Sequence, residues 1–140
     1  MRQKKLIAIL FTFVLVQNSI GGNAALTDWP QWQGPNRTGL STETGLLKSW
    51  PEKGPAVDWT ISGLGPGYGS MAIKGNRLLV QGVLGTNSVV FCLNPADGKT
   101  LWTQELGPTL KEGRGDGPRS TPTIDGERVY ALSENGDLAC

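Results

Sequence analysis

Few residues in this chain could carry out chemistry. The chain has no histidine, which removes Ser-His-Asp and Cys-His catalysis together with the commonest metal ligand. No group of Asp and Glu has the spacing of a calcium loop, and the cysteines Cys92 and Cys140 lie far apart in the sequence. We therefore assign no catalytic residue and no metal ligand from the sequence, and any cofactor-binding residues stay unknown.

A charged, Gly-rich link at 107–119 is the best candidate for binding. Its residues Arg114, Asp116 and Arg119 could hold an anionic ligand or partner on one face of the protein. The simpler interpretations are a solvated loop, or an Arg–Asp pair that joins two parts of the fold. We interpret the Arg-Gly-Asp at 114–116 as coincidental, and the glycosylation sequon at 36–38 as a pattern that matters only in a eukaryotic secretory route.

A second Gly-rich loop, at 63–69, has little in common with a phosphate site. It lacks the Gly-x-Gly-x-x-Gly spacing, it contains Pro66, and it leads into an expected strand. A phosphate site needs a helix N-terminus after the loop. We therefore predict a turn that links two strands.

The two loops lie before and between the two copies of an internal sequence repeat. Residues 70–80 align with 121–131 at an offset of 51, and 90–92 align with 138–140 at an offset of 48. Repeats of about this length, made of short strands, are typical of β-propeller blades, since one such sheet cannot bury its own faces and must stack on neighbours. The fold class expected is all-β: a propeller of four-stranded antiparallel blades, of which about one and a half are present.

The expected strands of the first blade lie at 70–73, 77–81, 89–93 and 100–105, after a lone strand at 57–61. A turn centred on Lys74-Gly75 joins the first two strands, and Asp125-Gly126 takes its place in the second blade. Asp-Gly is a strong two-residue hairpin signal, in which both turn residues need a positive φ. Asn135-Gly136 is expected to form the next hairpin.

The N-terminus, at 1–24, has the pattern of a secretory signal peptide, with three basic residues, an apolar run at 6–16 and small residues before a cleavage site after Ala24. The run is too short to cross a bilayer as a helix, so we expect no membrane span after cleavage and an exported protein, periplasmic or extracellular. A retained membrane anchor is the alternative. Without residues 1–24, 10 Lys and Arg face 12 Asp and Glu, so nucleic-acid binding has no electrostatic support.

An irregular leader rich in Trp and Pro follows, at 25–55, and the repeats occupy 56–140. Three of the five tryptophans lie in the leader. We expect it to pack on a surface, since exposed tryptophan is a liability; disorder is the alternative. Cys92 and Cys140 hold equivalent positions in the two repeats. A disulfide between them is one alternative, but equivalent sites in adjacent blades are usually too far apart for the bond, and each is expected to fill a small buried site.

The segment 93–102, LNPADGKTLW, resembles the signature of pyrroloquinoline-quinone-like (PQQ-like) β-propeller repeats. The leader at 28–39 is similar to the opening of exported PQQ-like proteins of planctomycete type, as is 115–123. In this family the Trp docks between neighbouring blades and the Gly lets an adjacent backbone approach. The resemblance gives these roles to Trp102 and Gly98. It places Trp59 on an outer strand from the N-terminus that closes the ring.

This resemblance implies a non-catalytic binding or scaffold module, like the propeller subunit that helps to assemble outer-membrane proteins, with a protein or small-ligand partner on a propeller face. The alternative is the N-terminal part of a PQQ-dependent alcohol or sugar dehydrogenase, for which PQQ and Ca²⁺ are the implied cofactors. A ring typically has four to eight blades. We therefore expect the chain to be a fragment of a longer protein, unstable or prone to aggregate when expressed alone.

Overall fold

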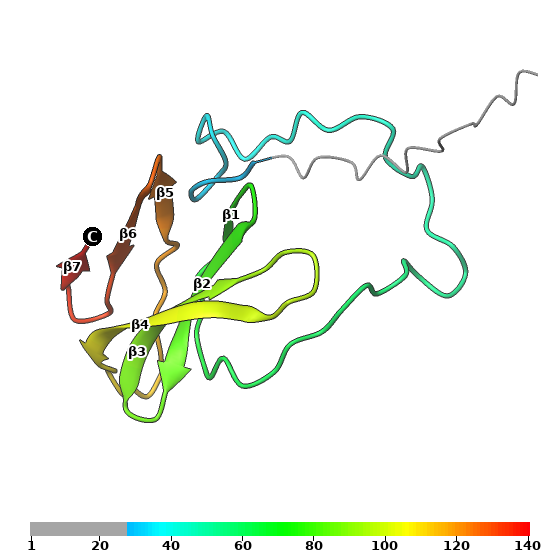
Figure 1. Ribbon diagram of the computed structural model, residues 1–140. Coiled ribbons are helices and arrows are strands. Elements are labelled where there is room, and N and C mark those ends of the chain that lie inside the picture. The colour runs from blue at the N-terminus through cyan, green and yellow to red at the C-terminus, as the bar shows by residue number, and fades with distance from the viewer. Residues whose placement is uncertain (1–27) are drawn as a thin grey trace, which may run out of the picture.

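The computed structural model describes residues 28–140, and every regular element in that range is a β-strand (Figure 1). The signal peptide expected at 1–24 lies outside the described residues. An antiparallel sheet of four strands, in the order β1-β2-β3-β4, is followed by a sheet of three, in the order β5-β6-β7. The strands are β1 (Ala72–Lys74), β2 (Arg77–Leu84), β3 (Asn87–Leu93), β4 (Thr100–Pro108), β5 (Thr123–Asp125), β6 (Arg128–Leu132) and β7 (Leu138–Ala139).

This arrangement confirms the all-β prediction of one whole blade and part of a second. No helix of the described residues is long and apolar enough to cross a membrane.

The first hairpin of each blade turns one residue later than expected. The pairs Lys74–Arg77 and Asp125–Arg128 close the ladders, so Gly75-Asn76 and Gly126-Glu127 are the turn residues. Only the glycine of each pair has a positive φ, 55° in Gly75 and 57° in Gly126. A glycine at the first central position is the mark of a type II′ turn. The expectation that both turn residues need a positive φ was therefore wrong.

The lone strand expected at 57–61 was also wrong, because this segment has no strand assignment in the structure. Its apolar side chains nevertheless have a clear role. Trp59 and Ile61, followed by Leu64, pack against one face of the first sheet, over a buried cluster. That cluster consists of Leu78, Val89, Phe91 and Leu93. The alternation of apolar residues thus marks an extended segment lying across a sheet face, which gains its stability from burial rather than from a ladder.

The opposite face of the first sheet meets the second sheet. One continuous core joins them, with buried side chains from both: Ala72, Leu79, Val90 and Cys92 from the first blade, and Ile124 and Ala131 from the second. Each blade therefore buries its apolar residues against a neighbour, as stacked propeller blades do.

The leader packs only in part. Trp29 is half-buried, but the side chains of Trp32 and Trp50 are 61% and 71% exposed. The expectation that the leader's tryptophans pack on a surface is thus correct for Trp29 and wrong for Trp32 and Trp50. The described part of the leader divides into a docked section, 28–39, and an exposed section from residue 40, which continues to residue 57.

Candidate functional site

The two sheets come closest at their first strands, β1 and β5, as blades converge on the channel of a propeller (Figure 1). Each of these strands is bonded to its own sheet on one side only. We call their other side the axial edge, and define it by the backbone groups of Ile73 and Ile124. These two residues hold equivalent positions in the two repeats. The axial edge is therefore a place where both blades offer the same groups next to each other.

The leader is hydrogen-bonded to this edge. Trp29 pairs with Ile73 in both directions, since its N–H donates to the Ile73 carbonyl at 2.8 Å and its carbonyl accepts from the Ile73 N–H at 2.9 Å. Pro30 accepts a bond of 2.8 Å from the Ile124 N–H. The Asp28 carboxylate accepts one of 2.9 Å from the Gly75 N–H, at the β1–β2 turn. Sequence reasoning missed this pairing, because backbone groups of any sequence can form it.

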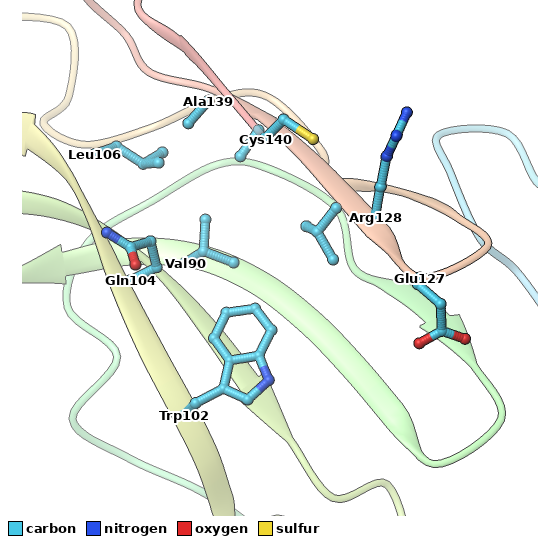
Figure 2. A pocket seen from close by; sticks show the side chains of 10 residues that line it. Val90, Trp102, Gln104, Leu106, Glu127, Arg128, Ala139 and Cys140 are labelled. Atoms are coloured by element: carbon cyan, nitrogen blue, oxygen red, sulfur yellow. The ribbon is translucent and has the colours of Figure 1, made fainter.

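A cavity of about 610 Å³ lies between the sheets (Figure 2). Trp102 and Gln104 of β4 stand on one side of it, and residues of the second blade, among them Arg128 and Cys140, stand on the other. Trp102 is 40% exposed. Its place between the blades agrees with the role that the family resemblance gives to this tryptophan.

Trp59, rather than a backbone segment, is what approaches Gly98. A Cβ built on Gly98 would lie 2.6 Å from Cε3 of the Trp59 ring. The Trp59 indole also donates a hydrogen bond of 2.9 Å to the Pro95 carbonyl in the same turn. The close approach expected at Gly98 is thus present, but a side chain makes it.

A half-buried carboxylate, Glu134, fastens the blades together near the end of β4. It accepts hydrogen bonds from the hydroxyls of Ser88 at 2.5 Å and Thr109 at 2.6 Å, and from the Leu110 N–H at 3.0 Å. Partial burial acts to raise the pKa of the Glu134 carboxyl, but these hydrogen bonds together outweigh it and hold the pKa below its ordinary value. We call this set of hydrogen bonds the Glu134 clasp. Its residues come from three separate segments of the sequence, so no local sequence pattern predicted it.

A second polar contact between the blades is built on Gln81, whose side chain is only 3% exposed. Its amide nitrogen donates to the Leu132 carbonyl at 3.1 Å, and its amide oxygen accepts from the Ser120 hydroxyl at 2.6 Å. Every buried side-chain nitrogen or oxygen among the described residues has a hydrogen-bond partner. The buried polar groups at this junction are therefore engaged in holding the blades together.

Of the three residues predicted in the charged link, Arg119 and Asp116 make contacts within the link itself. Arg119 forms an ion pair of 2.8 Å with Glu112 and lies 5.8 Å from the centre of the Tyr68 ring, while Arg114 is exposed. The Asp116 carboxylate accepts a bond of 3.1 Å from the Glu112 N–H. The alternative of an Arg–Asp pair that joins two parts of the fold is not realised among the described residues, because Arg119 pairs with a glutamate of its own loop. The Gly-rich loop at 63–69 links two extended segments, and its Tyr68 N–H bonds to the Pro118 carbonyl.

The two cysteines are both free, so the disulfide alternative is not realised. Cys92 is fully buried in the core shared by the blades, as expected. Cys140 is exposed, which corrects the expectation of a second buried site. Burial raises the pKa of the Cys92 thiol, and the nearby Arg77 opposes that rise.

We compared the sequence and the structure with known proteins. No curated protein and no solved structure matches the chain. A family model described as outer membrane protein assembly factor BamB matches residues 29–140, which is most of the chain and nearly all of its described part. The two stacked sheets, the tryptophan between them and this match agree, and the chain belongs to that family of PQQ-like repeat proteins.

Proposed function

We propose that this protein is an exported propeller module that binds other proteins, in the manner of the propeller subunits of outer-membrane protein assembly. The observation that carries the proposal is a group of large apolar side chains on the N-terminal segment, each 61% to 76% exposed. They are Trp32, Leu40, Leu46, Leu47, Trp50 and Val57. Soluble proteins rarely expose such a group unless a partner covers it, and tryptophan is enriched where partners bind tightly.

The proposal is tested with an unfolded outer-membrane β-barrel protein as the probe. We expect the chain to bind it, and the double variant Trp32→Ser, Trp50→Ser to bind about tenfold more weakly, a loss of roughly 1.4 kcal/mol. The matched control is Lys48→Ser with Glu52→Ser, which changes two side chains that flank Trp50. Isothermal titration calorimetry measures each affinity. Absence of binding, or equal weakening by the control, contradicts the proposal.

The alternative, a PQQ-dependent dehydrogenase, requires residues that fit a quinone with three carboxylates. Several of the described groups that could meet such carboxylates already have partners, which disfavours this alternative. The axial N–H groups of Ile73 and Ile124 are bonded to the leader, the Arg77 guanidinium donates to the Gly126 carbonyl, and Arg119 is paired with Glu112. Among the residues that the structure describes, no three His, Cys, Asp or Glu side chains lie together as a metal site would need.

The test of this alternative is direct. The protein is incubated with PQQ, Ca²⁺, an alcohol and an electron-accepting dye, and reduction of the dye is followed by absorbance. We expect no reduction above that of PQQ and Ca²⁺ alone. Turnover that depends on the protein and on the alcohol would replace the binding role with an enzymatic one.

A further inference from the structure

We propose that the axial edge of β1 and β5 is a binding site for an extended peptide with an Asp-Trp-Pro sequence, which the protein's own leader occupies in the resting state. The partner that fits is the leader of a second copy of this chain, because that segment presents the same groups. This inference rests on the proposed binding function and names a site and a ligand for it.

The first argument is the chemistry of the edge. It offers three N–H donors, from Ile73, Gly75 and Ile124, and one carbonyl acceptor, from Ile73. The leader supplies the matching groups, which are the Asp28 carboxylate, the N–H and carbonyl of Trp29, and the Pro30 carbonyl. Each donor–acceptor distance is 2.8 or 2.9 Å. Addition of an extended segment to a sheet edge is a common mode of peptide recognition. Here two successive leader residues bond to equivalent residues of two blades, so the site exists only where the blades meet.

The second argument is that the ligand segment is ordered by its own contacts. The Trp29 ring folds back on Gly34, where an added Cβ would lie 2.8 Å from Cζ3 of the ring. Backbone bonds join Gly34 to Gln31 and Gly39 to Gln33, and the Arg37 side chain donates to that of Gln31 at 3.1 Å. A segment that is already ordered loses less conformational entropy when it binds. Residues 28–39 can therefore bind as one segment that is already ordered.

The third argument is the tether. Residues 40–57 are exposed apart from Gly54, and within the described structure their hydrogen bonds run only to close neighbours in the sequence. Release of the leader from the axial edge therefore disturbs no other packed element. A leader held by such a tether can leave its own edge and bond to that of a second copy, which is the exchange seen in domain swapping.

Amide hydrogen exchange measured by NMR on the whole chain tests the proposal. In the variant Asp28→Ala, Trp29→Gly, the amides of Ile73, Gly75 and Ile124 should exchange at least about tenfold faster than in the original chain. An excess of a synthetic peptide of residues 28–39, added in trans, should restore their protection. The matched control is Glu43→Ala, which alters an exposed side chain of the leader outside residues 28–39 and should change none of these rates.

Results that contradict the proposal can be distinguished from simple unfolding of the variant. Unchanged exchange in the double variant, no restoration by the peptide, or equal restoration by a peptide of the same composition in scrambled order would each overturn the proposal. Amides of the central strands β2 and β3 report whether the variant is folded. If they too lose protection, the single variant Asp28→Ala decides: faster exchange at Gly75, reversed by the peptide, supports the site, and an unchanged rate refutes it. This readout is independent of whether the barrel probe binds.

Discussion

Trp59 and Gly98 are in contact across 39 positions of the sequence, with the indole ring occupying the space where any side chain at 98 would begin. The contact joins the irregular segment after the leader to the turn between β3 and β4. It also fixes the direction in which that segment crosses the sheet face, since Ile61 and Leu64 then fall over the same buried cluster.

The substitution Gly98→Ala should therefore cost about 2–5 kcal/mol of unfolding free energy, from backbone strain at a φ of 71° and from overpacking against the ring. Urea unfolding followed by tryptophan fluorescence measures this loss. Gly85→Ala is the matched control, because Gly85 has a φ of 63° but nothing within 4 Å of its added Cβ, and it should cost only about 1–2 kcal/mol. Equal losses in the two variants would show that the ring contact is unimportant.

Gln81 supports a second stability prediction. Replacing it with Leu removes both of its hydrogen bonds between the blades, so Gln81→Leu should destabilise the protein by about 1–3 kcal/mol. Gln104→Leu, at an exposed position of β4, should change stability by less than about 0.5 kcal/mol. The urea midpoints of the two variants are compared, and a smaller shift for Gln81→Leu than for Gln104→Leu contradicts the prediction.

The Glu134 clasp should make the stability of the blade junction depend on pH. The pKa of its carboxyl is held down in the folded state, so the folded state binds fewer protons there than the unfolded state. Its contribution is fully present above the ordinary glutamate pKa of about 4.3 and is lost as the pH falls through the lower folded value.

Glu134→Gln should therefore flatten the loss of thermal stability below about pH 4.3 and lower the stability at pH 7. Melting temperatures between pH 3 and pH 7 measure this. The control is Glu43→Gln, which alters an exposed leader carboxylate and should leave the curve unchanged. A Glu134→Gln curve parallel to that of the original chain would rule out the clasp as its cause.

The thiols should differ sharply in reactivity. Cys140 is exposed, whereas burial raises the pKa of Cys92 and keeps reagents away. With a chromogenic disulfide at pH 8, one thiol per chain should react quickly, and a second only when denaturant is added. Cys140→Ser should remove the fast phase. A fast phase that persists in this variant would place Cys92 at the surface.

The repeat predicted the four strands of the first blade and both strand pairings of the second, although it placed the turn of the first hairpin one residue too early, because alternating apolar residues around a Gly-containing turn are local signals. The same alternation failed at 57–61. Val57, Trp59 and Ile61 have the pattern of a strand, but a ladder needs a neighbouring chain, and the periodicity of one segment carries no information about that neighbour.

The candidate site was predictable only in outline. The role of Gly98 followed from the family resemblance, yet its partner Trp59 did not, because a close approach to Gly does not specify what approaches. Glu134 was missed since its donors, Ser88 and Thr109, come from elements far from it in the sequence. Pairing of the leader with Ile73 uses backbone groups, which leave no mark on residue type.

The leader's place on the axial edge also determines when it can bind during folding. Its bond from Asp28 to Gly75 spans 47 positions, and its bond from Pro30 must wait for Ile124 in the next blade. Hairpins close in microseconds, whereas contacts so distant in the sequence carry a larger loop-closure cost and form later. The segment that leaves the ribosome before either blade thus completes its hydrogen bonds only once the second blade has formed, and the bond between Pro30 and Ile124 reports that both blades are in place.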